Sequence, residues 1–192
     1  MYTLIFATNN AHKIAEIQSL VGPDFSIIDM KSAGIDIDIP EPHHTLNENA
    51  LEKAQTIFNI TKTNCFSEDT GLEIEALNGA PGVKSARYAG EDRNFQANID
   101  KVLDQLKNVE NRKAQFRTVI CLIWEGQTYY FEGICKGHIS ISMQGEKGFG
   151  YDPIFVPEGS NKSFAEMNME EKNRFSHRQK AVTQLFEFLR KQ

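Results

Sequence analysis

The sequence has few cysteines, and they show no spacing typical of a metal site or of a disulfide framework. Cys65, Cys121 and Cys135 are odd in number and widely separated, and no C-x-x-C pair occurs. Each stands in an apolar run, where a free thiol behaves as a small core residue. A disulfide-stapled scaffold and a structural zinc site are therefore excluded, and a reducing cytoplasm is the expected location.

The sequence also lacks a long hydrophobic run and an excess of positive charge. No stretch reaches the roughly 18 apolar residues of a membrane-spanning helix, and no signal-peptide pattern occurs, so we expect no membrane association. The net charge of −5 argues against a nucleic-acid polymer as partner, because proteins that bind the phosphate backbone carry a basic face. Small phosphorylated ligands are still allowed, since a few local lysines are enough to bind them.

No internal repeat, low-complexity tract or flexible linker divides the 192 residues, so we expect one domain spanning residues 1–192. Apolar patterns predict strands at 3–7, 25–28, 35–39, 64–67, 114–124 and 128–136, and helices at 14–21, 46–58, 95–106, 168–175 and 177–189. The capping box Thr45-Leu46-Asn47-Glu48 marks the start of the second helix. The fold class expected is α/β, with a mixed, twisted β-sheet flanked by helices.

The first candidate site lies where the strand at 3–7 gives way to a helix. The polar turn Thr8-Asn9-Asn10-Ala11-His12-Lys13 separates the two. Free backbone N–H groups and the positive end of the helix dipole attract phosphate at such a junction, and Lys13 adds a mobile positive charge. The alternative is a plain connection in which Asn10 caps the helix and Lys13 is solvated.

The second candidate is the acidic pair Glu68 and Asp69, at the end of the short strand expected at 64–67. Neighbouring side chains of a strand point to opposite faces, so we expect only one of the two to enter a cleft. Mg²⁺ commonly joins one or two protein carboxylates to substrate phosphates, and Glu41, on a loop constrained by prolines, is the candidate second ligand. The alternative is a pair of solvated acids that begin a turn at Thr70-Gly71.

Two later segments complete the set of candidate functional residues. Residues 145–153 place aromatic side chains among glycines, so a planar ligand could approach the backbone and stack on a ring. His177 and Arg178 lie in the first turn of the last expected helix, where the helix dipole disfavours cations, and a functional reason is therefore expected. The alternative is two surface charges paired with Glu170 or Glu171.

Six motifs occur together in a fixed order, and the match runs from residue 3 to about residue 190. They are Thr8-Asn9-Asn10…Lys13, Glu48-Asn49-Ala50…Lys53-Ala54, Glu68-Asp69-Thr70-Gly71-Leu72, Gly79-Ala80-Pro81-Gly82 with Ser85-Ala86-Arg87-Tyr88, Gly148-Phe149-Gly150-Tyr151-Asp152-Pro153 and Ser176-His177-Arg178. In this combination the chain resembles the inosine/xanthosine triphosphate pyrophosphatase family. It departs from the family pattern at Glu68 and Thr70, where an aspartate and a serine are usual.

The resemblance implies a homodimeric, two-lobed α/β enzyme with a nucleotide cleft between the lobes. Its reaction would be the Mg²⁺-dependent hydrolysis of ITP, dITP and XTP to the monophosphate and pyrophosphate, which cleanses the nucleotide pool. Asp69 would be the general base and a metal ligand, and Glu41 would assist the metal. The triphosphate would be held by Thr8, Asn9, Asn10, Ala11, His12, Lys13 and Lys53. The nucleoside pocket would be lined by Thr70, Phe149, Gly150, Tyr151, Asp152, Lys172, His177 and Arg178.

Base choice follows from hydrogen-bond chemistry. Hypoxanthine and xanthine present an acceptor at position 6, whereas adenine presents an amino donor there, so a donor such as Arg178 would favour the first two bases. Two other functions stay open at this point. One is a nucleotide-binding regulatory protein without turnover, and the other is a pyrophosphatase that acts on pyrimidine or methylated nucleotides.

Overall fold

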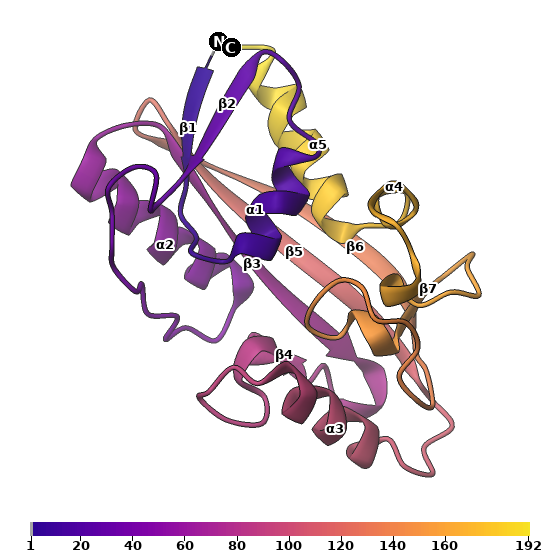
Figure 1. Cartoon of the computed structure of the whole chain (residues 1–192). Coiled ribbons are helices and arrows are strands. Elements are labelled where there is room, and N and C mark those ends of the chain that lie inside the picture. The colour runs from indigo at the N-terminus through magenta and orange to yellow at the C-terminus, as the bar shows by residue number, and fades with distance from the viewer. Residues whose placement is uncertain (1) are drawn as a thin grey trace. The chain divides into compact units, whose positions relative to one another are not determined.

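Seven strands and five α-helices make up residues 2–192, the part of the chain that this computed structural model describes (Figure 1). The strands are β1 (Tyr2–Phe6), β2 (Phe25–Asp29), β3 (Cys65–Ile74), β4 (Pro81–Gly82), β5 (Lys113–Trp124), β6 (Gln127–Ile139) and β7 (Phe155–Pro157). The α-helices are α1 (Ala11–Gln18), α2 (Leu46–Thr61), α3 (Phe95–Gln105), α4 (Met169–Asn173) and α5 (His177–Leu189). Short 3₁₀ turns lie at Glu75–Leu77, Ser85–Arg87, Asp152–Ile154 and Phe164–Glu166.

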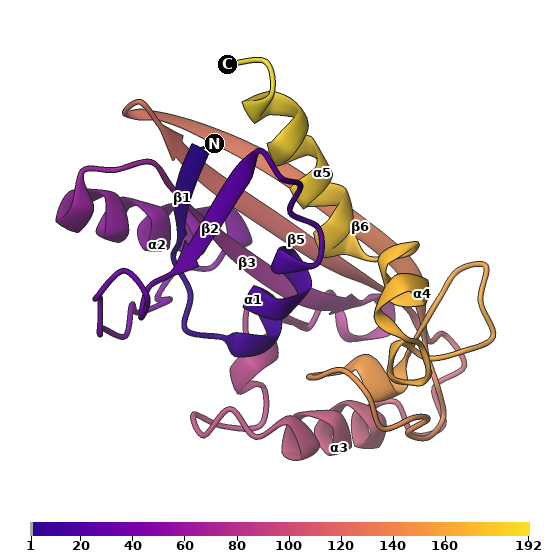
Figure 2. The ribbon, with the colours of Figure 1, turned by 45° about the horizontal axis from the view of Figure 1, so that its top comes forward.

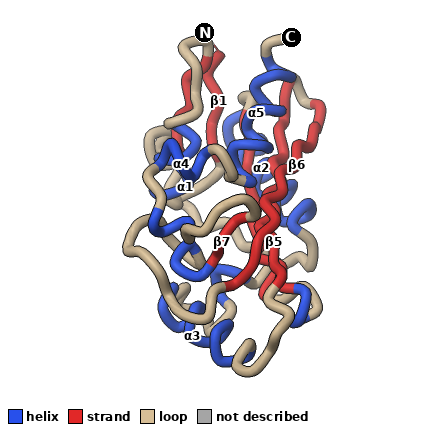
Figure 3. The backbone as a smooth tube through the Cα atoms, turned by 90° about the vertical axis from the view of Figure 1, so that its right-hand side faces the viewer, coloured by secondary structure: helices blue, strands red, loops and turns tan. Residues whose placement is uncertain are grey.

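The strands form one mixed sheet in the order β2-β1-β3-β5-β6-β7, and β4 pairs with β3. β1 runs parallel to both β2 and β3, whereas the β3–β4 and β6–β7 pairs are antiparallel. β5 and β6 are long strands joined by the turn at Glu125–Gly126, and both can be followed in Figure 3. The predicted α/β class, a mixed sheet flanked by helices, is confirmed.

The chain divides into two compact units. The first unit contains the chain up to Asp69, Thr118–Gly133 and Arg178–Gln192. In this unit α1 and α5 lie over one face of the strands, as Figures 1 and 2 show, and their apolar side chains pack on Leu4, Phe6 and Phe66. The apolar stripe of α5 repeats every three to four residues, as expected for a helix packed by one face.

The helix α2 covers the other face of β3 in the first unit. Ser67 donates its hydroxyl to the Ala50 carbonyl at 2.5 Å, and the Cys65 thiol lies 3.3 Å from the Ala54 carbonyl. Because side chains alternate along a strand, Cys65, Ser67 and Asp69 point to the α2 face and Phe66 and Glu68 to the face of α1 and α5.

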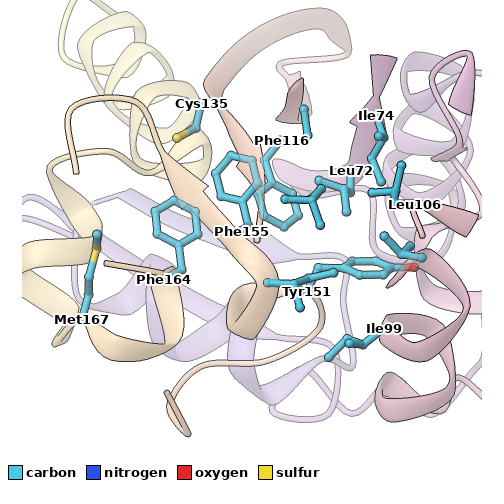
Figure 4. Close-up of a cluster of buried hydrophobic side chains, with 14 residues drawn as sticks. Leu72, Ile74, Ile99, Leu106, Phe116, Cys135, Tyr151, Phe155, Phe164 and Met167 are labelled. Carbon is cyan, nitrogen blue, oxygen red and sulfur yellow. The ribbon is translucent and has the colours of Figure 1, made fainter. Parts of the chain in front are cut away.

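The second unit contains Thr70–Arg117 and Ile134–His177 and has a hydrophobic core of its own (Figure 4). The core is rich in aromatic rings: Phe116 packs against Phe155 at 4.7 Å between ring centroids and against Phe164 at 6.1 Å. The Tyr151 ring, 4% exposed, belongs to the same cluster. These contacts fix the segment that contains the glycine-rich loop at 148–152.

Two strand predictions are wrong. Residues 35–39 form no strand, and their apolar alternation arises because Ile35 and Ile39 are buried at 8% and 7% exposure in an irregular loop. The strand expected at 64–67 continues to Ile74. Gly71 is a strand residue rather than a turn residue. A Cβ at this position would lie 2.7 Å from the Gly82 carbonyl oxygen of β4. Glycine at this position permits the close approach of β4.

The three cysteines are free and buried, as predicted. Among residues 2–192, no helix has both the length and the apolar character needed to cross a bilayer.

Candidate active site

The turn between β1 and α1 is capped as its sequence predicts. The Asn10 side-chain oxygen accepts hydrogen bonds from the backbone N–H groups of His12 at 3.0 Å and Lys13 at 3.2 Å. The Thr8 hydroxyl accepts from the Asn10 N–H at 3.2 Å, and the Asn9 amide donates to the Ile37 carbonyl at 3.0 Å. The turn is thereby ordered by its own side chains, with the positive end of the α1 dipole behind it.

Lys13 is not a solvated lysine. Its Nζ lies 3.0 Å from the Glu68 Oε1, and its side chain is 16% exposed. Of the alternative, the solvated Lys13 is therefore wrong, whereas the Asn10 cap is confirmed. The helix start carries a positive charge held close to the strand β3.

Arg178 is buried and bound by two carboxylates. Its Nε and Nη2 donate to the two oxygens of Glu68 at 2.5 and 2.8 Å, and its Nη1 donates to Glu16. The alternative of a surface charge paired with Glu170 or Glu171 is wrong, because those carboxylates pair with Arg174 and Lys162.

Glu16 is the residue that sequence reasoning missed. It lies on α1, is 5% exposed, and binds the Arg178 guanidinium. Its only signal in the sequence is an acidic residue three positions after Lys13, next to Ile17 on the apolar side of the helix. That signal does not identify the distant partner on α5.

The charges in this network stabilise one another. Burial alone would raise the pKa of Glu68, but the Arg178 guanidinium and the Lys13 ammonium hold that pKa well below the ordinary glutamate value. Burial opposes the charge of Arg178 as well, but Glu68 and Glu16 raise its pKa. Both groups therefore stay ionised, and their ion pairs connect α1 and α5 to β3.

Asp69 faces the other side of β3 and meets a second lysine. The Lys53 Nζ of α2 lies 2.9 Å from the Asp69 Oδ1 and 2.6 Å from the Glu41 Oε1. The Asp69 Oδ2 is buried and has no hydrogen-bond partner among residues 2–192. Burial raises the pKa of Asp69 despite the attraction of Lys53, whereas Asp69 and Glu41 together keep the pKa of Lys53 raised.

Glu68 and Asp69 do not end a strand, contrary to expectation. They lie within β3, but its parallel neighbour β1 ends at Phe6, which pairs with Phe66. The acidic pair therefore lies just beyond the carboxyl end of β1, where α/β sheets commonly place functional groups. The expectation that the two side chains point to opposite faces is confirmed, because they bind cations on different helices.

The donor set fits a magnesium ion shared with a substrate. No group of three or more His, Cys, Asp or Glu side chains able to hold a metal occurs within residues 2–192. Mg²⁺ often uses only one or two carboxylates together with phosphate oxygens and water. Glu41 and Asp69 already converge on one cationic group, Lys53, and the buried Asp69 Oδ2 offers an unused ligand oxygen.

In the second unit the glycine loop is fixed by a buried ion pair. The Lys172 Nζ lies 2.7 Å from the Asp152 Oδ2, which also accepts from the Phe149 N–H at 2.8 Å. Lys172 also lies 5.3 Å from the centre of the Phe149 ring. A Cβ at Gly148, whose φ is +77°, would lie 2.1 Å from the Asp152 Oδ2, so the turn needs glycine.

The remaining predicted residues of the nucleoside pocket are placed as follows. His177 is 3% exposed and stacks on Phe116 at 4.7 Å between ring centroids. Thr70 follows Asp69 in β3 and is half-buried, and Gly150 has a φ of +61°. Tyr151 is buried in the hydrophobic core and donates its hydroxyl to the Ser85 carbonyl at 2.8 Å.

Comparison with known proteins gives matches over nearly the whole chain. The sequence model of the Ham1 family matches residues 4–188. The chain belongs to the Ham1 family. Solved structures of this family superpose on it: the Ham1 protein of Staphylococcus aureus is 38% identical, covers 98% of each chain and has a TM-score of 0.88. A HAM1 protein from Coxiella burnetii is 35% identical, covers 100% of each chain and has a TM-score of 0.91.

Relatives of this Ham1-family chain carry a functional name. The dITP/XTP pyrophosphatase of Flavobacterium johnsoniae is 50% identical over 97% of both chains. The protein of the same name from Porphyromonas gingivalis is 50% identical over 98% of both chains.

Proposed function

We propose that this Ham1-family chain hydrolyses deaminated purine nucleoside triphosphates (ITP, dITP and XTP) to the nucleoside monophosphate and pyrophosphate. The observation that carries the proposal is the convergence of Glu41 and Asp69 on Lys53, with the Asp69 Oδ2 left without a partner. The names of relatives at 50% identity support the same activity. A regulatory protein without turnover would not need a buried and a half-buried carboxylate to meet beside a lysine.

The triphosphate would bind to the turn Thr8–Lys13 and to Lys53. The N-terminus of α1 supplies dipole and backbone donors, and Lys13 and Lys53 supply mobile positive charge. In the seven side chains of this cluster, three cations (Lys13, Lys53, Arg178) face four carboxylates (Glu16, Glu41, Glu68, Asp69). The net charge of −1 leaves room for a divalent cation to accompany the phosphates.

Glu41 and Asp69 would hold Mg²⁺ together with phosphate oxygens. When bound, the ion neutralises phosphate charge and lowers the pKa of coordinated water. In the proposed reaction a water oxygen attacks the α-phosphorus, the bond to the pyrophosphate oxygen breaks, and the water proton moves to Asp69. Lys13 and Lys53 stabilise the charge that develops on the leaving pyrophosphate.

The purine would be recognised by the residues predicted from the sequence: Thr70, Phe149, Gly150, Tyr151, Asp152, Lys172, His177 and Arg178. Phe149, next to the Lys172–Asp152 pair, offers a ring for stacking. Arg178 is held by Glu68 and Glu16 in one orientation, which suits a donor that must discriminate an acceptor from an amino group at position 6.

The proposal extends to the assembly and to the location of the protein. We propose a homodimer, as the family resemblance implies, and size-exclusion chromatography with light scattering tests it. We also propose a cytoplasmic location, which agrees with three free, buried cysteines.

The experiment that tests the activity is pyrophosphate release from a panel of nucleotides with Mg²⁺. We expect kcat/KM for ITP and XTP to exceed that for ATP by at least about 10²-fold, because a polar pocket that lacks its partner groups rejects the wrong base. Comparable kcat/KM for ATP and ITP would contradict the base assignment. Preference for a pyrimidine or methylated triphosphate would favour the alternative pyrophosphatase, and binding without release would favour a regulatory protein.

A further inference from the structure

The motif Ser85-Ala86-Arg87-Tyr88 has no role in the proposed reaction, yet its first residue joins three segments. Ser85 begins a 3₁₀ turn, and its Oγ accepts from the Leu72 N–H of β3 at 2.9 Å. The same hydroxyl donates to the Gly82 carbonyl of β4 at 2.6 Å. The same Gly82 carbonyl leaves no room for a Cβ at position 71, which is why that residue is glycine. Ser85 therefore fixes β3 two residues after Thr70.

The backbone carbonyl of Ser85 binds the glycine loop. It accepts the hydroxyl of Tyr151 at 2.8 Å, across 66 residues of sequence. The ring of Tyr151 lies in the core cluster with its oxygen directed out of it, as Figure 4 shows. Because Tyr151 is only 4% exposed, its ring contacts other protein side chains rather than solvent.

The turn that carries Ser85 is held rigidly by α3. The Asn98 amide donates to the Ala86 carbonyl at 3.0 Å, and its oxygen accepts from the Ala89 N–H at 2.7 Å. Lys101, one turn further along α3, donates to the Tyr88 carbonyl at 2.6 Å. Asn98 is 2% exposed, so its two contacts are largely sheltered from water, whereas the Lys101 contact is exposed.

We propose that Ser85 and Tyr151 form a latch that positions the glycine loop at 148–152 relative to the strand that carries Thr70, and thereby sets the affinity for the base. This inference rests on the proposed function. Ser85 acts through other residues and is a positioning residue, and the Tyr151 hydroxyl has the same positioning role in addition to the place of Tyr151 in the proposed nucleoside pocket. A loop already ordered before binding costs less to order in the complex, and the latch therefore acts mainly on KM.

The test compares variants that remove single hydroxyl groups. Tyr151→Phe removes the tyrosine donor to the Ser85 carbonyl, which keeps the longer contact from the Asn98 amide at 3.4 Å, and Ser85→Ala removes the hydroxyl that fixes Leu72. Ser160→Ala is the control for loss of a hydroxyl, because Ser160 lies in the same unit and bonds within its own exposed turn, to the Lys162 carbonyl at 3.3 Å and from the Lys162 N–H at 3.0 Å. Steady-state pyrophosphate release from ITP with Mg²⁺ and the melting temperature are measured for each.

We expect KM for ITP to rise about five-fold in Tyr151→Phe and in Ser85→Ala, the size of one lost hydrogen bond, and kcat of Ser85→Ala to stay within about two-fold of wild type. Ser85→Thr, which keeps a hydroxyl, should restore KM, and Ser160→Ala should leave KM unchanged.

Equal KM values for Tyr151→Phe and Ser160→Ala would overturn the latch, as would a fall in melting temperature with no change in KM. If Ser85→Ala does not fold, Tyr151→Phe decides alone. A wild-type protein that does not hydrolyse ITP would overturn the proposed function and the latch with it, whereas an active wild type with unaffected variants would overturn the latch alone.

Discussion

At the scale of single residues, the site depends on buried charges of opposite sign that stabilise one another. Arg178 is 2% exposed, and a lone buried guanidinium would be strongly unfavourable. Glu68 occupies its fork with two parallel hydrogen bonds, and Glu16 takes a third N–H group. Its orientation is therefore set by two carboxylates before any ligand binds.

Asp69 differs, because its environment disfavours its charge. Burial raises its pKa, and only one of its oxygens is paired. Asp69→Asn should change the free energy of unfolding little, because the relief of an unfavourable buried charge is offset by the loss of a charged partner for Lys53, while hydrolysis of ITP falls by about 10²–10⁴-fold, as for loss of a general base. Urea denaturation and pyrophosphate release measure the two quantities. Substantial turnover in the folded variant would remove Asp69 from the mechanism.

At the scale of elements, Glu68 links β3 to α1 and α5 through Lys13 and Arg178. In the folded state its pKa lies well below the reference value of 4.5. The unfolded chain binds the Glu68 proton at a higher pH than the folded chain, so ionised Glu68 stabilises the fold above about pH 4.5. This contribution is lost as the pH falls through that value towards the folded pKa.

The corresponding prediction concerns Glu68→Gln. The variant should be less stable than wild type at neutral pH, since Arg178 and Lys13 lose a charged partner. The difference should shrink as the pH falls below about 4.5, because Glu68 of the unfolded wild-type chain is then protonated and folding has to release that proton. Urea unfolding between about pH 3 and about pH 7 measures it, and a difference independent of pH would show that Glu68 carries no such linkage.

The contact between β3 and β4 gives a second prediction at this scale. Gly71→Ala would place a Cβ 2.7 Å from the Gly82 oxygen and 2.9 Å from its carbon, both in the backbone, so the strands must separate. We expect a loss of about 1–3 kcal/mol in the free energy of unfolding.

Gly22→Ala is the control for Gly71→Ala, since its Cβ would meet only the end of Arg190 at 3.5 Å, an ordinary contact. It should change stability by no more than about 0.5 kcal/mol. Equal effects of the two substitutions would show that β4 does not approach β3 this closely.

At the scale of the whole molecule, local signals predicted most elements. The cap at Thr45 is confirmed: its oxygen accepts from the Glu48 N–H at 3.2 Å. The extent of β3 could not be predicted, because Thr70-Gly71 is typical of turns and only the approach of β4 explains the glycine. The strand predicted at 35–39 was wrong as well, because alternating apolar residues indicate which side chains are buried and not whether the backbone pairs with another strand.

The candidate site was predicted in part. Residue types and spacing indicated the polar turn at 8–13 with Lys13 and the acidic pair, the family resemblance added Lys53 and Lys172, and the family assignment is confirmed. Sequence alone did not indicate that Arg178 binds Glu68 across 110 positions, or that Glu16 joins it. Such pairs depend on how the helices pack on the sheet. The residues next to each partner in the sequence do not indicate that packing.

Ligand binding gives the last prediction. Lys53 already supplies a cation to Glu41 and Asp69, so Mg²⁺ alone gains little at these carboxylates and should hardly change the melting temperature. A nonhydrolysable ITP analogue brings phosphates that bind Lys13 and Lys53 and leave the carboxylates to the metal. Mg²⁺ and the analogue together should therefore raise the melting temperature, because a ligand that binds only the folded state stabilises it by mass action.

Calorimetry with each ligand alone and with both measures this coupling. The matching ATP analogue is the control for the base, and Asp69→Asn is the control for the metal. Each should give a smaller shift than wild type with Mg²⁺ and the ITP analogue. If Mg²⁺ alone produced the full shift, the carboxylates would bind the metal without substrate phosphates. The assignment of Lys53 as the cation that Glu41 and Asp69 share before substrate binds would then be wrong.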